Sequence, residues 1–324
     1  MDIYVKKAII HQFSPDDTDL YLADKFLNIT PKIEEYLRKK IERVYSDEAR
    51  TGIFEEDNPF LEMISDDLLE TSVAVANRWK EEFVVSENQK TNDLVFVEFS
   101  KEGVDHFAFL RIALRETLTH LGGEVDNPIK LTQNNLPGFG TGADEALVIN
   151  LQSRKYHLIE KRIKYNGTFL NYFSENLLQA QPKISPKKSI KALEKTAQKI
   201  AESFNTDDFQ FHSKVKSAIF NHIEEENKLS PEKLADDLFD DNLTARLSFI
   251  DQVKEAVPEP VTFEEIDASR QLKKFENQKL SLSNGIELIV PNNVYEDAES
   301  VEFILNENGT YSILIKNIED IQSK

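Results

Sequence analysis

The sequence predicts an α+β protein, with a mostly antiparallel sheet and helices in the N-terminal half, a helical middle segment and a C-terminal β-hairpin region. Three observations predict this class. Strand-like segments separated by turns fill much of the first half, helical periodicity dominates beyond residue 168, and two hairpin patterns lie near the C-terminus. We therefore expect an α+β domain over 1–165, and over 166–324 a helical segment followed by a small β-rich part.

The N-terminal segment predicts a hairpin followed by a helix. Ile3–Ile10 has strand-like composition, and turn residues over 14–19 lead into the apolar residues 20–22. Thr30 is expected to be an N-cap because Pro31 then occupies the first helical position. Apolar side chains recur at helical spacing after it, which predicts a helix.

The rest of the first half predicts one more helix and two strand pairs. The helix is expected from Pro59 to about Phe83, whereas residues 116–144 show no clear pattern. Four segments are strand-like: Leu94–Phe99, Phe107–Leu114, Ala146–Leu151 and Tyr156–Ile159. Short turns separate the first two and the last two, so each pair predicts an antiparallel hairpin.

The second half predicts helices and then hairpins. Candidate helices cover 168–178, 187–204, 207–227, 230–240 and 243–256. Ser230 followed by Pro231 is a clear helix start. Asn284 and Gly285 form a two-residue turn between the strand-like segments 279–283 and 286–290. A second hairpin is expected to pair 301–305 with 311–315.

Composition excludes several classes of protein. The chain has no Cys, which excludes disulfides, Cys–zinc sites and a thiol nucleophile. The N-terminus lacks the order of a signal peptide, and no apolar run approaches the roughly 18–20 residues that span a bilayer. We therefore expect a cytoplasmic protein without membrane contact. A net charge of −19 argues at first against a nucleic-acid ligand.

The charge is, however, distributed unevenly. Residues 151–200 contain 11 basic and 3 acidic side chains, whereas 1–150 contain 16 basic and 29 acidic ones. Lys187, Lys191, Lys195 and Lys199 recur every four residues, so they follow one face of a helix. Such a row suits a phosphate backbone. A solvated helix face, or a contact with acidic parts of the same chain or of a dimer partner, would explain the row equally well.

No catalytic constellation is evident. The Gly-rich segment 137–142 precedes a strand rather than a helix and lacks Gly-Lys-Ser/Thr, so it does not match a phosphate-binding loop. Asp93 and Glu98 with Lys101 come near a metal-dependent nuclease pattern, but the last gap is one residue too long. We predict no catalytic residue, no metal and no cofactor. A nuclease remains an alternative.

Several segments, taken in order, resemble a known family. They are the strand Ala8–Gln12, the helix exit Tyr45–Phe54, the basic passage Leu158–Phe173, the pair Phe249 and Ile250, and the segment Asp267–Phe275. Together with the mass of 37.3 kDa, they resemble the bacterial 37-kDa nucleoid-associated (NdpA/YejK-like) proteins over nearly the full chain. The resemblance implies a nucleoid location and DNA binding, and it implies no catalytic site. Asn166–Thr168 departs from the basic character expected at that place.

The first functional hypothesis is a nucleoid-associated, sequence-tolerant DNA-binding protein. Ten residues would contact phosphates: Arg154, Lys155, Lys161, Arg162, Lys164, Lys187, Lys188, Lys191, Lys195 and Lys199. Such contacts position a protein without reading bases. The ligand is expected to be double-stranded DNA, and the sequence does not distinguish it from RNA.

The second hypothesis is an adaptor that binds nucleoid or DNA-processing proteins. Its contact surface would be the acidic helical segment 201–260, which could mimic the charge of DNA. A homodimer is compatible with either hypothesis.

Overall fold

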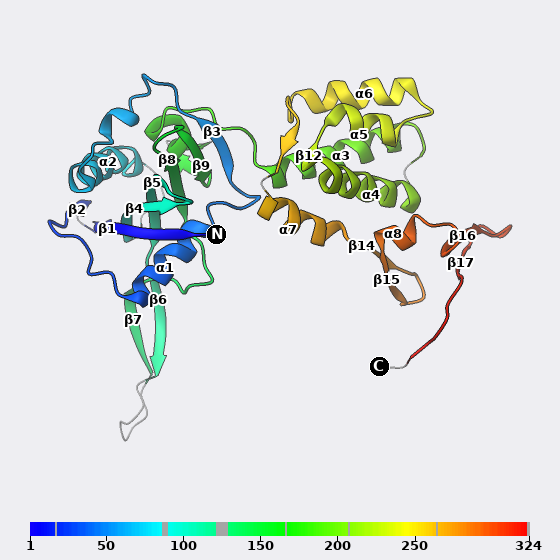
Figure 1. Ribbon diagram of the computed structural model, residues 1–324, viewed down its shortest axis with the longest axis horizontal. Helices are drawn as coiled ribbons and strands as arrows, with labels where there is room; N and C mark the ends of the chain where they lie inside the picture. The colour runs from blue at the N-terminus through cyan, green and yellow to red at the C-terminus, as the bar shows by residue number, and fades with distance from the viewer. Residues whose placement is uncertain are drawn as a thin grey trace. The chain divides into compact units, whose positions relative to one another are not determined.

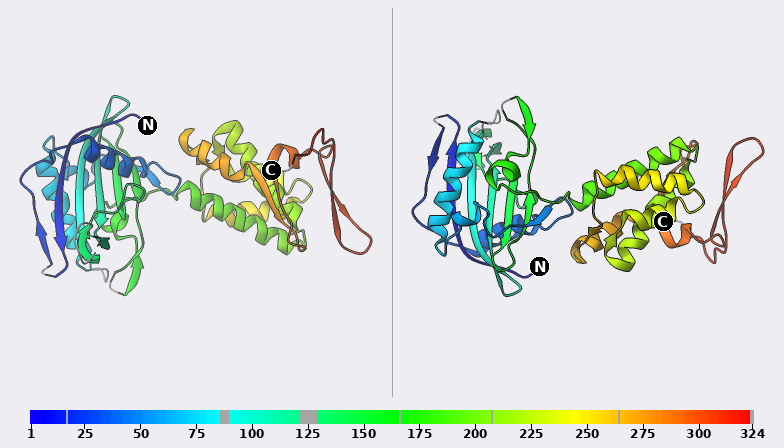
Figure 2. Two further views of the ribbon diagram at one scale, coloured as in Figure 1. Left: turned by 90° about the horizontal axis from the view of Figure 1, so that it is seen from below. Right: turned by 90° about the horizontal axis from the view of Figure 1, so that it is seen from above.

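The computed structural model describes residues 1–16, 18–85, 90–120, 129–165, 167–206, 208–263 and 265–322. The chain divides into two compact units, Met1–Ser185 and Pro186–Lys324. Figure 1 labels the elements of each, and Figure 2 gives two further views. The fold is mixed α+β: an antiparallel sheet dominates the first unit, whereas the second combines helices with C-terminal hairpins.

A seven-stranded sheet forms the centre of the first unit, and all of its neighbouring strands are antiparallel. In spatial order its strands are β2 (Asp19–Tyr21), β1 (Ile3–Ser14), β4 (Asn92–Lys101), β5 (Val104–Ala113), β8 (Glu145–Asn150), β9 (Lys155–Ile159) and β3 (Arg50–Ile53). The predicted N-terminal hairpin and both predicted strand pairs are confirmed.

A helix covers each face of this sheet. On one face, Leu37 and Ile41 of α1 (Pro31–Glu42) pack with Val95. On the other, Trp79 of α2 (Leu68–Phe83) packs with Phe96. Val95 and Phe96 are neighbours on β4, so the period-two alternation of the strand supplies apolar side chains to both cores. β4 is therefore buried on both faces.

The predicted helix over 59–83 is wrong in its first part. A short 3₁₀ turn, η1 (Leu61–Met63), ends at Ile64, whose backbone is extended. The α-helix then begins at Leu68, because the Asp67 side chain accepts a hydrogen bond from the Leu69 amide at 2.8 Å. This capping bond satisfies a first-turn amide that a continuous helix would pair internally.

Residues that showed no clear pattern in the sequence contain a two-stranded ribbon. Its strands are β6 (Arg115–His120) and β7 (Ile129–Asn135), which pair only with each other. Figure 1 shows the ribbon extending away from the sheet. Leu118 and Leu131 lie opposite each other on it and are exposed, so apolar periodicity does not mark a core here.

The predicted helix over 168–178 is also partly wrong. Thr168–Leu170 is a strand, β11, which pairs with β10 (Ile163–Tyr165), and the only helical part is a π-helical turn, η2 (Phe173–Leu177). Tyr172 and Phe173 are fully buried in the core of the first unit. Burial of these aromatic rings against the sheet overrides local helix propensity.

The second unit is built on five helices around one apolar core. They are α3 (Pro186–Ser203), α4 (Phe209–Glu226), α5 (Pro231–Leu238), α6 (Leu243–Lys254) and α7 (Glu265–Phe275). Ser230 caps α5, as predicted, and Asp208 and Asn242 cap α4 and α6. A two-residue strand β12 (Lys228–Leu229) pairs with β13 (Val261–Thr262) between these helices.

Two hairpins complete the second unit, as predicted, but the turn of the first is not the predicted two-residue one: Leu282 lies opposite Ile286, so the connection is the three residues 283–285. Their strands are β14 (Asn277–Ser281) with β15 (Glu287–Pro291), and β16 (Val301–Leu305) with β17 (Tyr311–Ile315). The short helix α8 (Asn292–Tyr295) links them. Buried Gln278 joins the first hairpin to α4, because its amide donates to the Ser213 carbonyl at 3.2 Å and to Asn292 Oδ1 at 2.8 Å.

Candidate nucleic-acid interface

α3 presents a row of exposed lysines opposite its buried face. Its exposed lysines are Lys187, Lys188, Lys191, Lys195 and Lys199. At 3.6 residues per turn these five positions fall within an arc of about 120°. The buried residues Ile190, Leu193, Ala197 and Ile200 occupy the other side. Packing of the apolar stripe therefore fixes the direction in which the lysines point.

The row is long enough to follow a nucleic-acid backbone. Lys187 and Lys199 are twelve residues apart, which is about 18 Å along a helix axis. Glu194 and Glu202 are the acidic residues of α3. Burial raises the pKa of Glu194, and the nearby ammonium groups of Lys216 and Lys191 oppose this shift. Glu194 is thus partly buried, and it interacts with Lys191 of the row.

Arg154 and Lys155 lie elsewhere, at the turn between β8 and β9 of the first unit. The Arg154 guanidinium forms an ion pair with Glu56 at 3.0 Å. Its backbone has a φ of 60°, and its carbonyl accepts a hydrogen bond from the Phe54 amide at 3.1 Å. Arg154 therefore has a structural role in this turn. Lys155 is exposed on the first position of β9.

Lys161, Arg162 and Lys164 follow the other end of β9. Lys161 Nζ pairs with Asp144 Oδ1 at 3.3 Å, and Arg162 Nη2 donates to the Phe169 carbonyl at 2.8 Å. A five-residue strand is about 17 Å long, so β9 holds these residues apart from Arg154. The five candidate phosphate-contacting residues of the first unit therefore form two separate groups. The α3 row belongs to the second unit.

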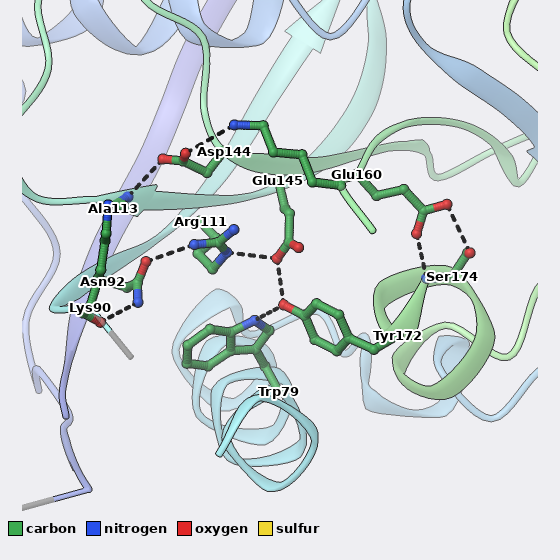
Figure 3. Close-up of polar contacts among 11 residues, drawn as sticks. Trp79, Lys90, Asn92, Arg111, Ala113, Asp144, Glu145, Glu160, Tyr172 and Ser174 are labelled. Carbon is green, nitrogen blue, oxygen red and sulfur yellow. Dashed lines mark hydrogen bonds and ion pairs between the residues drawn. The ribbon is translucent and has the colours of Figure 1, made fainter. Parts of the chain in front are cut away.

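A buried polar network that the sequence reasoning missed crosses the sheet of the first unit (Figure 3). Arg111 on β5 donates through Nε to Glu145 Oε2 on β8 at 2.6 Å, and through Nη1 to Asn92 Oδ1 on β4 at 2.9 Å. The Tyr172 hydroxyl also donates to Glu145, and Trp79 Nε1 donates to that hydroxyl at 3.0 Å. The network thus connects three strands to α2 and to the start of η2.

The buried ion pair of Arg111 with Glu145 determines the pKa shifts in this network. Burial lowers the pKa of Arg111, but the adjacent Glu145 carboxylate more than offsets this and raises it overall. Burial, together with Glu145, raises the pKa of Tyr172 well above its usual value, so its hydroxyl remains a donor. The sequence signal was the charged Arg111 inside the otherwise apolar segment Phe107–Leu114. All of these side chains are buried, so the network holds the strands, α2 and η2 together inside the core.

A second missed feature is buried Lys40, which holds the Gly-rich segment 137–142. Its ammonium donates to the carbonyls of Pro137 at 3.3 Å, Gly138 at 2.9 Å and Thr141. Burial, with smaller contributions from Arg43 and Arg115, lowers the pKa of Lys40 to about 8. A phosphate-binding loop directs amide N–H groups at its ligand. Here carbonyls converge on a lysine, and β8 follows the segment as expected from the sequence.

The family comparison gives these features a context. A protein-family model described as nucleoid-associated protein YejK matches residues 9–321. The chain belongs to this family. No curated protein matches the chain. The description of the YejK family gives a nucleoid association and names no reaction.

The segments that resemble the YejK family contain both buried and exposed residues. His11 is fully buried on β1, where Nδ1 accepts from the Ala23 amide at 3.0 Å and Nε2 lies 2.9 Å from Ser72 Oγ. Burial lowers its pKa to about 4, so the ring is neutral at pH 7. Gly52 in Tyr45–Phe54 lies directly against the Tyr156 ring, where a Cβ atom would collide. These residues of the YejK-family chain therefore serve packing.

Two further observations bear on function in this YejK-family chain. Within the described ranges, no group of three or more His, Asp or Glu side chains is arranged to hold a metal ion. Among those same residues, no helix is both long and apolar enough to cross a bilayer.

Proposed function

We propose that this chain is a nucleoid DNA-binding protein whose principal contact is the lysine row of α3, namely Lys187, Lys188, Lys191, Lys195 and Lys199. The observation that carries the proposal is the exposure of all five side chains on one face of a single helix. Like charges at four-residue spacing destabilise a helix slightly. A polyanion bound along the row would relieve that repulsion.

The proposed binding tolerates changes of base sequence. A lysine ammonium is a compact point charge that contacts phosphate oxygens and carries no planar hydrogen-bonding fork. Phosphate contacts fix position and supply affinity, whereas base-edge contacts supply specificity. The net charge of −19 opposes DNA at other surfaces, so we expect weak, orientated and salt-sensitive binding.

We assign a secondary role in DNA binding to the five candidate phosphate-contacting residues of the first unit. Lys155 and Lys164 are exposed, and both already interact within the chain. Arg154, Lys161 and Arg162 would likewise have to leave their partners, Glu56, Asp144 and the Phe169 carbonyl, before they contact phosphates. Such exchanges reduce the net gain from each new contact.

Ion pairs formed by the acidic residues of the segment 201–260 weaken the adaptor hypothesis. Several acidic residues of the helices between 201 and 260 already have basic partners within the same unit. These pairs are Glu226 with Lys233, Asp237 with His222, Asp240 with Lys214, and Asp236 with Arg246. A DNA mimic would present carboxylates without such compensation.

Charge reversal tests the proposal. We expect Lys187→Glu/Lys191→Glu/Lys195→Glu to abolish binding of a short fluorescent DNA duplex, measured by anisotropy at low salt. The matched control Lys25→Glu/Lys32→Glu/Lys254→Glu changes the net charge equally at exposed positions outside α3. Binding that survives the α3 reversal, or that the control abolishes equally, would overturn the proposal. An RNA duplex in parallel tests whether the ligand is DNA.

A further inference from the structure

Apolar side chains line a groove between the two C-terminal hairpins of the second unit. The groove has a volume of about 910 Å³. Its apolar lining consists of Leu280, Leu282, Ile286 and Leu288 from the first hairpin, Phe303, Tyr311, Ile313 and Ile315 from the second, and Phe209 from α4. Lys216, Lys279 and His212 are its charged or titratable lining residues.

The register of the hairpins explains why the groove is apolar. In β16–β17, Val301 pairs with Ile315 and Phe303 pairs with Ile313, so one face of this hairpin is apolar. Phe209 attaches that face to α4, with its ring 5.1 Å from the ring of Phe303. Each hairpin is a separate two-stranded sheet. Isolated two-stranded hairpins are marginally stable in water and need an apolar partner.

The exposed apolar surface extends beyond the groove. Leu305, Tyr311 and Ile315 are each about half exposed or more, and after β17 the side chains of Ile318 and Ile321 are 52% and 83% exposed. Exposed apolar side chains that lie together in this way mark interaction sites on protein surfaces.

We propose that a second copy of this chain occupies the groove. In the pair, the apolar hairpin face and the segment 318–322 of each copy would lie against the groove of the other, which makes a closed two-fold interface. The charges of the segment 318–322 are complementary to those of the groove. Glu319 and Asp320 flank the exposed isoleucines, whereas the groove is lined by Lys216 and Lys279 and contains no acidic lining residue.

Sedimentation equilibrium of the nuclease-treated full chain tests the proposal. We expect a mass of twice 37.3 kDa, with a dissociation constant in the micromolar range or tighter. Ile286→Asp/Ile315→Asp, on the groove face, should give monomers. Ile304→Asp/Leu314→Asp is the matched control, because these exposed residues lie on the face of the second hairpin that is opposite to the groove. It should remain dimeric.

A charge exchange tests the assigned occupant. Glu319→Lys/Asp320→Lys and Lys216→Glu/Lys279→Glu should each weaken the homodimer at least tenfold. Mixing the two variants should restore a heterodimer, because each altered segment then meets an altered groove. A monomeric wild type, an equal loss in the back-face control, or no heterodimer on mixing would each overturn the proposal. The readout needs no DNA, so its failure is distinct from failure of DNA binding.

Discussion

Arg111 and Glu145 lie side by side on neighbouring strands, with Nε and Oε2 2.6 Å apart, and both are buried in the core of the first unit. Arg111 also donates to Asn92, and the Tyr172 hydroxyl donates to the same Glu145 oxygen, whereas Glu145 Oε1 is buried without a hydrogen-bond partner among the described residues. Removing one member of such a pair leaves a charge that the interior cannot solvate. The core is therefore more sensitive to the loss of one charge than to the loss of both.

A double-mutant cycle at this pair tests that sensitivity. We expect Arg111→Met and Glu145→Gln each to lower the free energy of unfolding of the first unit by about 3–5 kcal/mol. The double variant should lose less than the sum of the two. Trp79 is the single tryptophan of the sequence and lies in this core, so its fluorescence during urea unfolding reports on the first unit. Additive losses would show that the charges are not coupled.

Buried His11 should make the stability of the first unit depend on pH. Its pKa is about 4 when folded, against about 6.5 when exposed, so the unfolded state binds the proton more strongly. The stabilisation that the neutral His11 ring contributes is fully present above pH 6.5 and is lost as the pH falls towards 4. The loss lowers the free energy of unfolding by about 3 kcal/mol. We expect His11→Gln to remove this part of the pH dependence of Trp79-monitored unfolding. An unchanged slope between pH 4 and 6.5 would contradict the assignment.

Lys40 should control the order of the Gly-rich segment 137–142. Lys40→Met removes the donor shared by three carbonyls, of which that of Pro137 keeps a bond from the Tyr36 hydroxyl at 3.0 Å. A buried acceptor left without a partner costs about 1–3 kcal/mol. We expect faster cleavage within this segment in limited proteolysis. Lys32→Met is the control, because Lys32 is an exposed lysine of the same helix α1. Equal cleavage of both variants would mean that Lys40 does not hold the segment.

Local sequence signals predicted much of the fold because they determine local structure. Thr30 with Pro31 and Ser230 with Pro231 mark helix starts that the structure confirms. Asn284 and Gly285 mark the turn of a confirmed hairpin, where Gly285 has a φ of 87°. In these places the turn or cap depends on neighbouring residues only.

Features that depend on distant residues escaped prediction. The Arg111–Glu145 pair spans 34 positions and exists only through the register of β5 with β8. The predicted helix over 168–178 failed because Tyr172 and Phe173 are buried by strands and a helix far away in sequence. Of the candidate site, the α3 row was predictable from its four-residue spacing. The internal partners of Arg154 and Lys161 were not.

The salt dependence of DNA binding is the most direct test of the central claim. Each phosphate contact contributes about −0.9 to the slope of log K against log salt concentration. With three to five contacts from α3, we expect a slope of about −3 to −4.5 for the unaltered chain. Lys187→Gln/Lys191→Gln/Lys195→Gln should reduce its magnitude by about 2.7. A slope that stays unchanged in this variant would show that DNA binds elsewhere and would contradict the account.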